Sequence, residues 1–458
     1  MNIDIVGLGY VGLVSGVCLA DKGHNVTCYD LNKNIINNVN KAKPHIYEPG
    51  LNKILKKNIH NKRFRAKYLT PNNNFSSNII IIAVGTPSKN KKIDLNQIES
   101  ACKAIAIYIK KNKQFVSLII KSTIPPSTTD TYIKNIIEKF SKKKLSKGDF
   151  GLGMNPEFLK EGSAVNDFLF ADRIVIGFED KKTKLILKKM YEPWKCDKIF
   201  VNSRTAEMIK YSSNILLAMQ ISGANEIANF CHSLGNIDVN SVFHGVTTDI
   251  RWNPIVNKKR VNPGILTYLK SGPGFGGSCF PKDLEAFINI SNNQKIKTNL
   301  FKEVKKVNDK QPELMIKLIE KNYFKLDNKK ILILGLSFKP ETDDIRESIS
   351  IKIINKLTSN KKNIKIFAHD PLAMSNSKKI INQSKKVIFV DKWENNILLV
   401  DIIMILTNWT DYNNLKLLKN VKNLKNKIII DTRGMFTKQN FKNINYFSFN
   451  SYSEKYIK

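Results

Sequence analysis

Short runs of consecutive hydrophobic residues recur along the chain, and longer amphipathic stretches separate them. In the first half such runs lie at 2–6, 25–29, 79–84, 115–120, 150–154 and 173–177. Continuous apolar runs of this length, alternating with helical patterns, are typical of parallel strands that are buried on both faces. The pattern therefore predicts a doubly wound α/β lobe, and we expect the run at 173–177 to close its sheet.

The same alternation returns after a long helical stretch. From Thr205 to about Leu234 the pattern is helical, and a helix of about 30 residues spans ~45 Å. Further apolar runs at 328–334, 364–369, 400–406 and 427–431 predict a second doubly wound lobe. A length of 458 residues fits about three domains of ~150 residues each.

The first strand leads directly into a glycine fingerprint, Gly7-Leu-Gly9-Tyr-Val-Gly12, and a helix follows. In this context the first glycine makes the turn, the second admits a pyrophosphate and the third lets helix and strand pack. Asp30 ends the second strand, where a carboxylate binds the adenosine ribose and repels a 2′-phosphate. The pattern predicts a Rossmann-like lobe that binds NAD rather than NADP, although the nearby Lys33 weakens that preference.

The fold expected is therefore α/β, with two doubly wound Rossmann-like lobes joined by a long central helix and a helical middle domain. The expected domains are 1–203, which binds NAD, 204–310, which carries the central helix and a cysteine loop, and 311–458. Because the second lobe turns at Gly335 without the full fingerprint, we expect it to bind a nucleotide other than the redox cofactor. His369 is interpreted as a strand-end histidine rather than a catalyst, and the polar tail from Ser448 is expected to be mobile.

The net charge of +36 does not by itself predict nucleic-acid binding. The lysines are spread along the chain among asparagines, and no basic stripe with aromatic residues accompanies them, so we interpret them as solvated faces. The six cysteines contain no CxxC pair, which argues against a disulfide framework or a zinc site. Five of them are expected in the core: Cys18, Cys28, Cys102, Cys196 and Cys231. No signal peptide and no apolar run of ~18 residues is recognised, which predicts a cytoplasmic protein.

The sixth cysteine, Cys279, lies in the glycine-rich stretch 271–283. Glycines allow a loop to present a side chain, and Lys282 together with a helix beginning near Pro281 would favour the thiolate. This arrangement predicts a covalent nucleophile, while the alternative is a buried free cysteine in a tight turn. Lys210 and Asn214 are spaced to share one helix face and suit an oxyanion, although a lysine on a solvated face is the simpler interpretation.

Other polar residues follow the predicted strands of the first lobe. Thr86 and Thr123 come after two buried runs, where they could line a ligand crevice or cap strand ends. Glu157 and Glu161 are four residues apart and would share a face if that stretch were helical. They are equally consistent with a site and with a solvated surface.

Four segments, 155–162, 206–214, 274–283 and 338–348, together resemble the UDP-glucose/GDP-mannose dehydrogenase family, in that family's order and over essentially the whole chain. The resemblance implies a four-electron oxidation of UDP-glucose to UDP-glucuronate with two NAD⁺, through a thiohemiacetal and a thioester on Cys279. In this scheme Lys210 and Asn214 stabilise oxyanions, and Lys210 is also a candidate proton acceptor. Asp283 and Thr123 position a water, and Glu157 assists hydrolysis of the thioester.

The resemblance assigns three sets of residues and no metal site. The catalytic set is Cys279, Lys210, Asn214, Asp283, Glu157 and Thr123. The cofactor-binding set is Gly7, Gly9, Tyr10, Val11, Gly12, Asp30, Lys33, Thr86, Thr123, Glu161, Lys282 and Arg346. The substrate-binding set is Glu157, Phe158, Leu159, Lys210, Asn214, Arg251, Arg260, Tyr268, Gly272, Gly276, Lys339 and Arg433.

The chain departs from the family pattern at two places. Arg251 matches an arginine that reaches a neighbouring subunit's substrate, but it lies further upstream than usual, and Arg260 could serve instead. Lys43 stands where the family usually has glycine. Alternatives left open are GDP-mannose or a UDP-N-acetylhexosamine as substrate, with Ser278 and the sequence 280–282 favouring UDP-glucose, and a non-catalytic nucleotide-sugar-binding protein. The long central helix also predicts a homodimer or a higher homo-oligomer.

Overall fold

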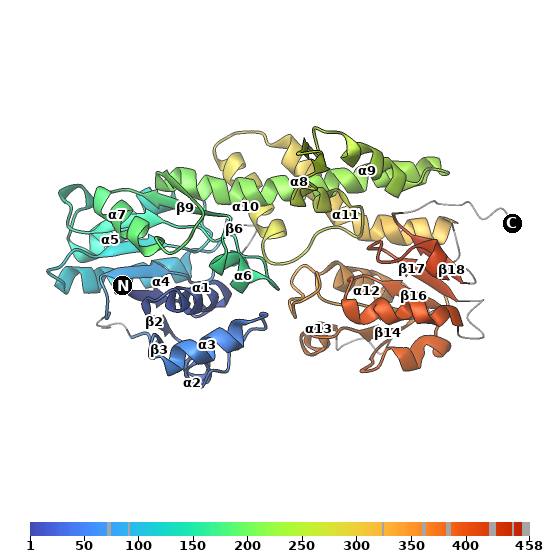
Figure 1. Ribbon diagram of the computed structural model, residues 1–458, viewed down its shortest axis with the longest axis horizontal. Helices are drawn as coiled ribbons and strands as arrows, with labels where there is room; N and C mark the ends of the chain where they lie inside the picture. The colour runs from blue at the N-terminus through green and yellow to red at the C-terminus, as the bar shows by residue number, and fades with distance from the viewer. Residues whose placement is uncertain are drawn as a thin grey trace. The chain divides into compact units, whose positions relative to one another are not determined.

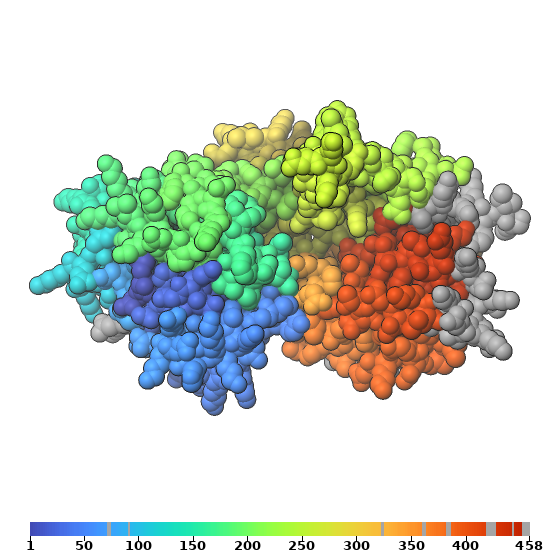
Figure 2. All heavy atoms as spheres, viewed as in Figure 1, coloured from blue at the N-terminus to red at the C-terminus, as the bar shows by residue number. Residues whose placement is uncertain are grey.

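The computed structural model describes residues 1–70, 75–89, 92–322, 325–359, 363–381, 386–420, 427–441 and 444–450. The chain divides into two compact units, Met1–Ser213 and Asn214–Lys458. Figure 1 colours the first unit from blue to green and the second from green to red. In Figure 2 the atoms of residues 1–70 and of the neighbouring described segments of the first unit form a closely packed surface.

The first unit is built on an eight-stranded sheet with the order β10-β9-β8-β7-β4-β1-β2-β3. Its strands are β1 (Asn2–Val6), β2 (Asn25–Asp30), β3 (Phe64–Tyr68), β4 (Ile79–Ile82), β7 (Ser117–Ile120), β8 (Gly151–Met154), β9 (Arg173–Phe178) and β10 (Asp197–Val201). All neighbours pair in parallel except β8 and β9, which are antiparallel. The central strands are buried throughout, as the continuous apolar runs predict.

Helices cover this sheet, and short elements connect its strands. The helices are α1 (Tyr10–Asp21), α2 (Lys33–Asn40), α3 (Leu51–His60), α4 (Asn96–Lys111), α5 (Lys134–Ser141), α6 (Ala164–Leu169) and α7 (Lys181–Met190). The short elements are the hairpin β5 (Ser88–Lys89) and β6 (Lys92–Ile93), the π-helix η1 (Thr128–Ile133) and the 3₁₀ turn η2 (Leu145–Lys147).

Two details of the predicted sheet are wrong. The run at 173–177 does not close the sheet, because β10 pairs with β9 in parallel beyond it. Strand β3 was not predicted; buried and exposed residues alternate along it before an exposed end. Both are edge strands with partly solvated faces, so neither produces the continuous apolar run by which the inner strands were recognised.

The long predicted helix is confirmed as α8 (Ser203–Leu234), which begins in the first unit and continues into the second. The second unit contains a six-stranded parallel sheet with the order β15-β14-β13-β16-β17-β18. Its strands are β13 (Lys330–Leu334), β14 (Lys365–His369), β15 (Val387–Phe389), β16 (Ile402–Ile405), β17 (Ile428–Asp431) and β18 (Asn445–Ser448).

The remaining elements of this unit are mostly helical. They are α9 (Val239–Thr248), α10 (Phe280–Asn293), α11 (Asn299–Asn322), α12 (Ile349–Ser359), α13 (Met374–Ile381), the 3₁₀ turns η3 (Gly264–Leu269), η4 (Glu394–Leu399), η5 (Thr410–Asn420) and η6 (Lys438–Phe441), and the hairpin β11 (Ile255–Val256) and β12 (Lys259–Arg260). The second doubly wound lobe is therefore confirmed. The boundaries 1–203, 204–310 and 311–458 stay a prediction.

Three local predictions differ from the structure. Residues 155–160 form no helix, so the spacing argument for Glu157 and Glu161 does not apply. Residues 448–450 are buried, and Asn450 accepts a hydrogen bond from the Ser271 hydroxyl at 2.6 Å, so the expectation of a mobile tail from Ser448 is wrong for them. The rest of the tail, 451–458, lies outside the described residues. Cys196 is only partly buried, whereas the other four cysteines expected in the core are buried.

Candidate active site

The glycine turn between β1 and α1 has the geometry that the fingerprint requires. Gly7 has φ +103°, and a Cβ at that position would lie 2.7 Å from the Ala83 carbonyl oxygen. A Cβ on Gly12 would lie 1.9 Å from the Gly7 carbonyl oxygen, whereas nothing lies within 4 Å of a Cβ built on Gly9. Gly7 and Gly12 are thus required by packing, and Gly9 leaves space in front of the N-terminus of α1 for a phosphate.

Asp30 lies at the wall of a hollow of about 910 Å³ that Gly7, Gly9 and Leu31 also line. One carboxylate oxygen accepts the Leu8 amide at 2.7 Å, and the other accepts the Asn32 amide at 2.8 Å. These two bonds fix the carboxylate, and its half-buried position leaves acceptor capacity toward the hollow. The hollow and its acid fit the adenosine ribose of NAD. Lys33 has its ammonium 5.2 Å from the centre of the Tyr68 ring.

The ends of β4 and β7 are tied together beside this turn. Thr86 donates its hydroxyl to the Thr123 carbonyl at 2.8 Å, and Ser122 donates its own to the Val84 carbonyl at 2.7 Å. The Thr86 hydroxyl therefore has the strand-end role that the simpler interpretation gave it. Thr123 is brought next to Thr86 but remains half-buried.

A buried ion pair lies at the end of β8. The Lys210 ammonium of α8 lies 2.9 Å from a Glu157 carboxylate oxygen, and the two side chains are 3% and 7% exposed. The other Glu157 oxygen accepts the Leu159 amide at 2.7 Å. Burial alone would raise the pKa of Glu157, but the Lys210 ammonium, the Leu159 amide and the Lys121 ammonium together hold the pKa below its usual value. The interpretation of Lys210 as a lysine on a solvated helix face is thus wrong.

Phe158, a predicted substrate-binding residue, lies next to this ion pair. The Arg173 guanidinium stacks on the Phe158 ring at 4.1 Å, and the Lys210 ammonium lies 5.4 Å from the same ring. Tyr10 donates its hydroxyl to Glu48, and that bond and burial raise the pKa of Tyr10. Glu48 in turn accepts the amides of Gly162 at 2.8 Å and Ala164 at 2.7 Å, beside Glu161. It therefore links the glycine turn to the segment that follows Glu157.

In the second unit, Cys279 caps the N-terminus of α10 (Phe280–Asn293), with Pro281 in the first turn, as predicted. Its side chain is partly exposed, and the Ser278 hydroxyl lies 3.6 Å from its sulfur. Cys279 therefore lies at the positive end of the α10 helix dipole, a position that favours a thiolate. The alternative of a buried free cysteine does not hold.

The glycine loop before Cys279 is fixed by side-chain amides from two helices. Asn225 of α8 accepts the Gly272 amide at 2.8 Å, and Gln311 of α11 donates to the Gly272 carbonyl at 3.0 Å. Asn308 of α11 accepts the Phe275 amide at 2.7 Å and donates to its carbonyl at 3.0 Å. The loop is therefore rigidly held despite its glycine content.

Asn214 and Asp283 meet beside the cysteine loop. Asn214 donates its side-chain amide to Asp283 at 2.6 Å, and the Lys282 ammonium lies 2.9 Å from the other Asp283 oxygen. Asp283 is almost fully buried. Lys282 was expected to favour the thiolate, but the contact observed for its ammonium is with Asp283.

Some of the predicted substrate-binding residues of the second unit lie in or next to the same loop. Arg433 is half-buried, and the loss of hydration lowers its pKa to about 10. Its Nε donates to the Leu406 carbonyl at 2.8 Å. A Cβ built on Gly272 would lie 3.9 Å from its guanidinium. Lys339 has its ammonium 5.6 Å from the Phe338 ring, and the Tyr268 and Phe280 rings are 6.4 Å apart. A Cβ on Gly276 would lie 2.4 Å from the Glu347 carbonyl oxygen, so this position requires glycine.

Three predicted arginines lie at the surface. Arg251 is 85% exposed and pairs with Asp249, and Arg260 donates to the Thr248 carbonyl at 2.7 Å. Arg346 pairs with Asp344 at 2.7 Å, and its carbonyl accepts the Gly277 amide at 2.9 Å. The choice between Arg251 and Arg260 stays a prediction.

The second lobe repeats the strand–glycine–acid step of the first but uses the acid differently. Gly335 has φ +97°, and Asp370 follows β14 as Asp30 ends β2. Asp370 accepts the amides of Leu336 and Ser337 and the Trp409 indole, at 2.7, 2.9 and 3.2 Å. Asp370 is therefore engaged in binding its own lobe. His369 bonds the Tyr412 hydroxyl at 3.1 Å, which confirms the strand-end interpretation.

Sequence reasoning missed several buried polar residues, among them Lys121, Asn155 and Glu207. Glu207 of α8 accepts the Ser127 amide at 2.7 Å and both the amide and the hydroxyl of Thr129, at 2.9 and 2.6 Å. It holds the segment that follows Thr123 against α8, one turn before Lys210. A carboxylate in an apolar helical pattern could have signalled such a role, but its partners are distant in sequence.

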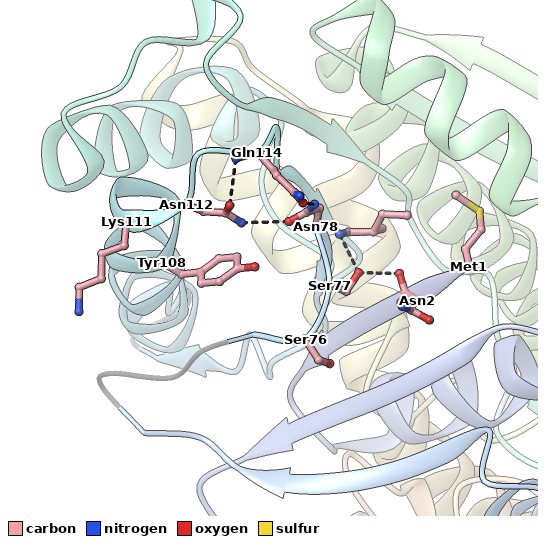
Figure 3. A pocket seen from close by; sticks show the side chains of 10 residues that line it. Met1, Asn2, Ser76, Ser77, Asn78, Tyr108, Lys111, Asn112 and Gln114 are labelled. Carbon is pink, nitrogen blue, oxygen red and sulfur yellow. Dashed lines mark hydrogen bonds between the residues drawn. The ribbon is translucent and has the colours of Figure 1, made fainter.

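A second hollow lies at the amino ends of β1 and β4, and Figure 3 shows its lining. Its amides are paired with one another: Asn112 donates to Asn78 at 2.9 Å, and Asn78 donates to Gln114. No group of metal-binding side chains occurs among the described residues. Nor is any helix in the described ranges long and apolar enough to cross a membrane.

Comparison with known proteins gives matches along most of the chain. Models of the UDP-glucose/GDP-mannose dehydrogenase family match residues 1–195 (NAD binding domain), 204–310 (central domain) and 332–438 (UDP binding domain). A UDP-glucose 6-dehydrogenase of Bacillus subtilis is 37% identical over 438 residues, covering 95% of this chain and 94% of its own. The Rickettsia conorii protein of that name is 37% identical over 449 residues, covering 97% and 98%.

Solved structures agree with these matches. A UDP-glucose dehydrogenase from Pyrobaculum islandicum superposes with a TM-score of 0.83 at 31% identity, covering 98% of each chain. A UDP-D-ManNAc dehydrogenase from Pyrococcus horikoshii gives 0.79 at 25% identity, covering 98% of this chain and 99% of its own.

We expect Asp30→Ala to weaken NAD binding by about 10- to 100-fold, because it removes a charge-assisted bond to the ribose worth about 1.5–3 kcal/mol. Calorimetric titration of the purified protein with NAD⁺ measures this. Asp21→Asn, which alters an acid paired with Lys57 at 2.8 Å, is the control and should bind NAD⁺ normally. Equal affinity in all three proteins would contradict the assignment of Asp30.

Glu207 predicts a pH dependence of stability. Burial raises its pKa from 4.5 to about 7, so the folded protein binds an extra proton between these values. The stabilisation from this proton is full below pH 4.5 and is lost as pH rises through 7. Relative to Glu207→Gln, the wild type should lose up to about 3 kcal/mol of unfolding free energy between pH 5 and 7.5.

Urea unfolding followed by circular dichroism across this pH range measures the difference. Glu192→Gln, at an exposed position, should follow the wild type at every pH. Parallel curves for wild type and Glu207→Gln would contradict the prediction.

Proposed function

This chain belongs to the UDP-glucose/GDP-mannose dehydrogenase family, and we propose that it oxidises UDP-glucose to UDP-glucuronate with two NAD⁺. The observation that carries this proposal is Cys279, a partly exposed cysteine at the N-terminus of α10 on a loop held by side-chain amides. The names of the Bacillus subtilis and Rickettsia conorii relatives support UDP-glucose as the substrate. Overall, the alcohol of UDP-glucose, two NAD⁺ and one water give the carboxylate of UDP-glucuronate, two NADH and three protons.

NAD⁺, when bound, accepts the hydride from carbon 6 in each of the two oxidations. The chain's part is to hold it: the turn with Gly7, Gly9 and Gly12 and the N-terminus of α1 bind the pyrophosphate, and Asp30 binds the ribose. Tyr10, Val11, Lys33, Thr86, Glu161, Lys282 and Arg346 are proposed as further contacts. The hollow beside Asp30 supports these assignments in the first unit.

Lys210 acts in the first oxidation. Its amine takes the proton of the 6-hydroxyl group, and Glu157 at 2.9 Å accommodates the ammonium that results. Asn214, one helical turn further along α8, donates its amide to the oxyanions that form at carbon 6. The position of Lys210, buried beside Glu157 and one helical turn before Asn214 on α8, supports this role.

Cys279 acts in the second half of the reaction. Its thiolate adds to the aldehyde to form a thiohemiacetal, and loss of a second hydride from carbon 6 leaves a thioester. Asp283, oriented by Asn214 and Lys282, and Thr123 position the water that attacks it. Glu157 assists the hydrolysis, after which Cys279 leaves as the thiolate.

The nucleotide end of the substrate is assigned to the second unit, whose residues 332–438 match a UDP binding domain model. Lys339 and Arg433 supply positive charge for the diphosphate, and Tyr268, Gly272 and Gly276 belong to the loop region beside it. Phe158, Leu159 and either Arg251 or Arg260 complete the proposed set. We also propose the domain boundaries 1–203, 204–310 and 311–458.

GDP-mannose and a UDP-N-acetylhexosamine remain the alternative substrates. The second is favoured by one observation, the similarity to the UDP-D-ManNAc dehydrogenase structure at a TM-score of 0.79. Ser278 and the sequence Phe280-Pro281-Lys282 favour glucose, because N-acetylhexosamine-oxidising relatives differ at these places.

NADH formation at 340 nm with UDP-glucose, UDP-N-acetylglucosamine and GDP-mannose in parallel tests the proposal. We expect turnover with UDP-glucose, about two NADH per sugar, and at least a ~10³-fold lower rate for Cys279→Ala because the covalent step is lost. Cys196→Ala, which alters a cysteine outside the loop, should retain the wild-type rate.

Each contrary result has a separate meaning. One NADH per sugar would show that the reaction stops at the aldehyde and that the thioester step is wrong. Preference for another sugar would keep the chemistry and change the substrate. The absence of NADH with all three sugars would favour a nucleotide-sugar-binding protein without activity.

We propose a homodimer or a higher homo-oligomer in the cytoplasm. Large apolar side chains of α8 are exposed in the single chain: Leu216, Ile227, Phe230 and Leu234. The free cysteines are typical of a reducing compartment. Light scattering coupled to gel filtration should give at least twice the chain mass of 52.2 kDa, and Phe230→Asp should lower it. A wild-type mass of one chain would contradict the dimer.

A further inference from the structure

Lys121 is a buried cation that the reaction scheme above does not use. It follows β7 directly, its amide donates to the Ile82 carbonyl at 2.8 Å, and its side chain is 3% exposed. The ammonium donates to the Asn155 side-chain oxygen at 3.0 Å and lies 3.4 Å from the Asn155 carbonyl oxygen. It also lies 5.4 Å from the centre of the Phe168 ring. A buried lysine is costly, so its contacts require an explanation.

Asn155, the partner of Lys121, is held by hydrogen bonds of both its backbone and its side chain. Its amide donates to the Ile120 carbonyl at 2.8 Å, and its side-chain NH₂ donates to the Val175 carbonyl at 2.8 Å. Its side-chain oxygen accepts the Tyr191 hydroxyl as well as Lys121. Asn155 is therefore a fixed point between β7 and β9, and it begins the turn that reaches Glu157 two residues later.

The charges around Lys121 form a group of two cations and one anion. Burial lowers the pKa of Lys121 to about 8, the Glu157 carboxylate opposes this, and the Lys210 ammonium adds to it. Lys121 in turn helps to lower the pKa of Glu157. Tyr191, the other titratable group at Asn155, has a pKa raised by burial and stays a neutral donor. Glu157 thus carries the compensating charge for both lysines.

We propose that Lys121 is a positioning residue, which holds the Asn155–Glu157 turn beside Lys210 and opposes protonation of the Lys210 amine. The repulsion between the two ammonium groups is mutual, so the charge on Lys121 favours the neutral amine that must accept the substrate proton. The inference rests on the proposed function, since it assigns Lys210 the role of that acceptor.

The kinetic test compares Lys121→Met and Lys121→Arg with the wild type, using the pH profile of kcat for NADH formation. In Lys121→Met we expect the acid limb to move up by about 0.5–1 pH unit and kcat at pH 7 to fall about 10-fold, with KM for NAD⁺ within 2-fold. Lys121→Arg keeps the charge and should restore the position of the limb. Lys143→Met, a lysine that binds the Asn112 carbonyl at 2.6 Å, should leave the profile unchanged.

A purely structural lysine would lower kcat without moving the limb. An unshifted acid limb in an active Lys121→Met variant therefore overturns the inference. So does a limb in Lys121→Arg that is displaced as far as in Lys121→Met.

A second measurement needs no activity. Between pH 8 and 10.5 the folded wild type binds fewer protons than the unfolded chain, so its stability should rise with pH in this window through Lys121. In Lys121→Met, urea unfolding should give a smaller slope of the unfolding free energy against pH. The decrease in slope should correspond to at most one bound proton. Equal slopes would show that Lys121 is not a buried titrating ammonium and would overturn the inference. This result is independent of whether any sugar is oxidised, so failure of the proposed function and failure of the inference are distinguishable.

Discussion

The ion pair between Glu157 and Lys210 is buried, and removing two charges from water is expensive unless hydrogen bonds and further charges compensate for it. The first unit supplies part of that compensation. The Leu159 amide donates to Glu157, and the Lys121 ammonium also stabilises its negative charge. The carboxyl ends of β7 and β8 and the helix α8 must therefore keep a fixed arrangement. Glu207 reinforces it by tying the segment after Thr123 to the same helix.

The second unit meets a different constraint, because a glycine loop has no side chains with which to hold itself. Folding such a loop costs conformational entropy, and the side-chain amides of Asn225, Asn308 and Gln311 offset this by binding its backbone. All three amides come from α8 or α11, and both helices are long. Cys279 therefore lies at the N-terminus of α10, at the end of a loop whose conformation is fixed by side chains of α8 and α11. A catalytic nucleophile requires such a fixed position.

Much of this arrangement could be predicted from the sequence, because it is encoded locally. Buried parallel strands are apolar runs, the fingerprint lies within six residues of chain from Gly7 to Gly12, and the cysteine loop announces itself by its glycines. The edge strands β3 and β10 were not predicted, because their exposed residues interrupt the apolar pattern. The buried polar contacts could not be predicted, because their partners are distant in sequence. Lys121 and Asn155 are 34 residues apart, and Glu207 is 78–80 residues from its partners. A single polar residue in the sequence does not indicate a distant partner.

The two lobes show how one local pattern can be put to two uses. Both place a glycine after the first strand and an acid after the second, and in both the acid binds the amide that follows the glycine. Asp30 accepts one further amide, that of Asn32, and remains half-buried beside a hollow. Asp370 accepts three further amides and the Trp409 indole and is almost fully buried. An acid that is fully engaged in this way holds its own lobe together, so a nucleotide there must be recognised by other groups. The basic residues Lys339 and Arg433 have the charge for that task, and Asp30 of the first lobe is the acid that we propose for the ribose of NAD.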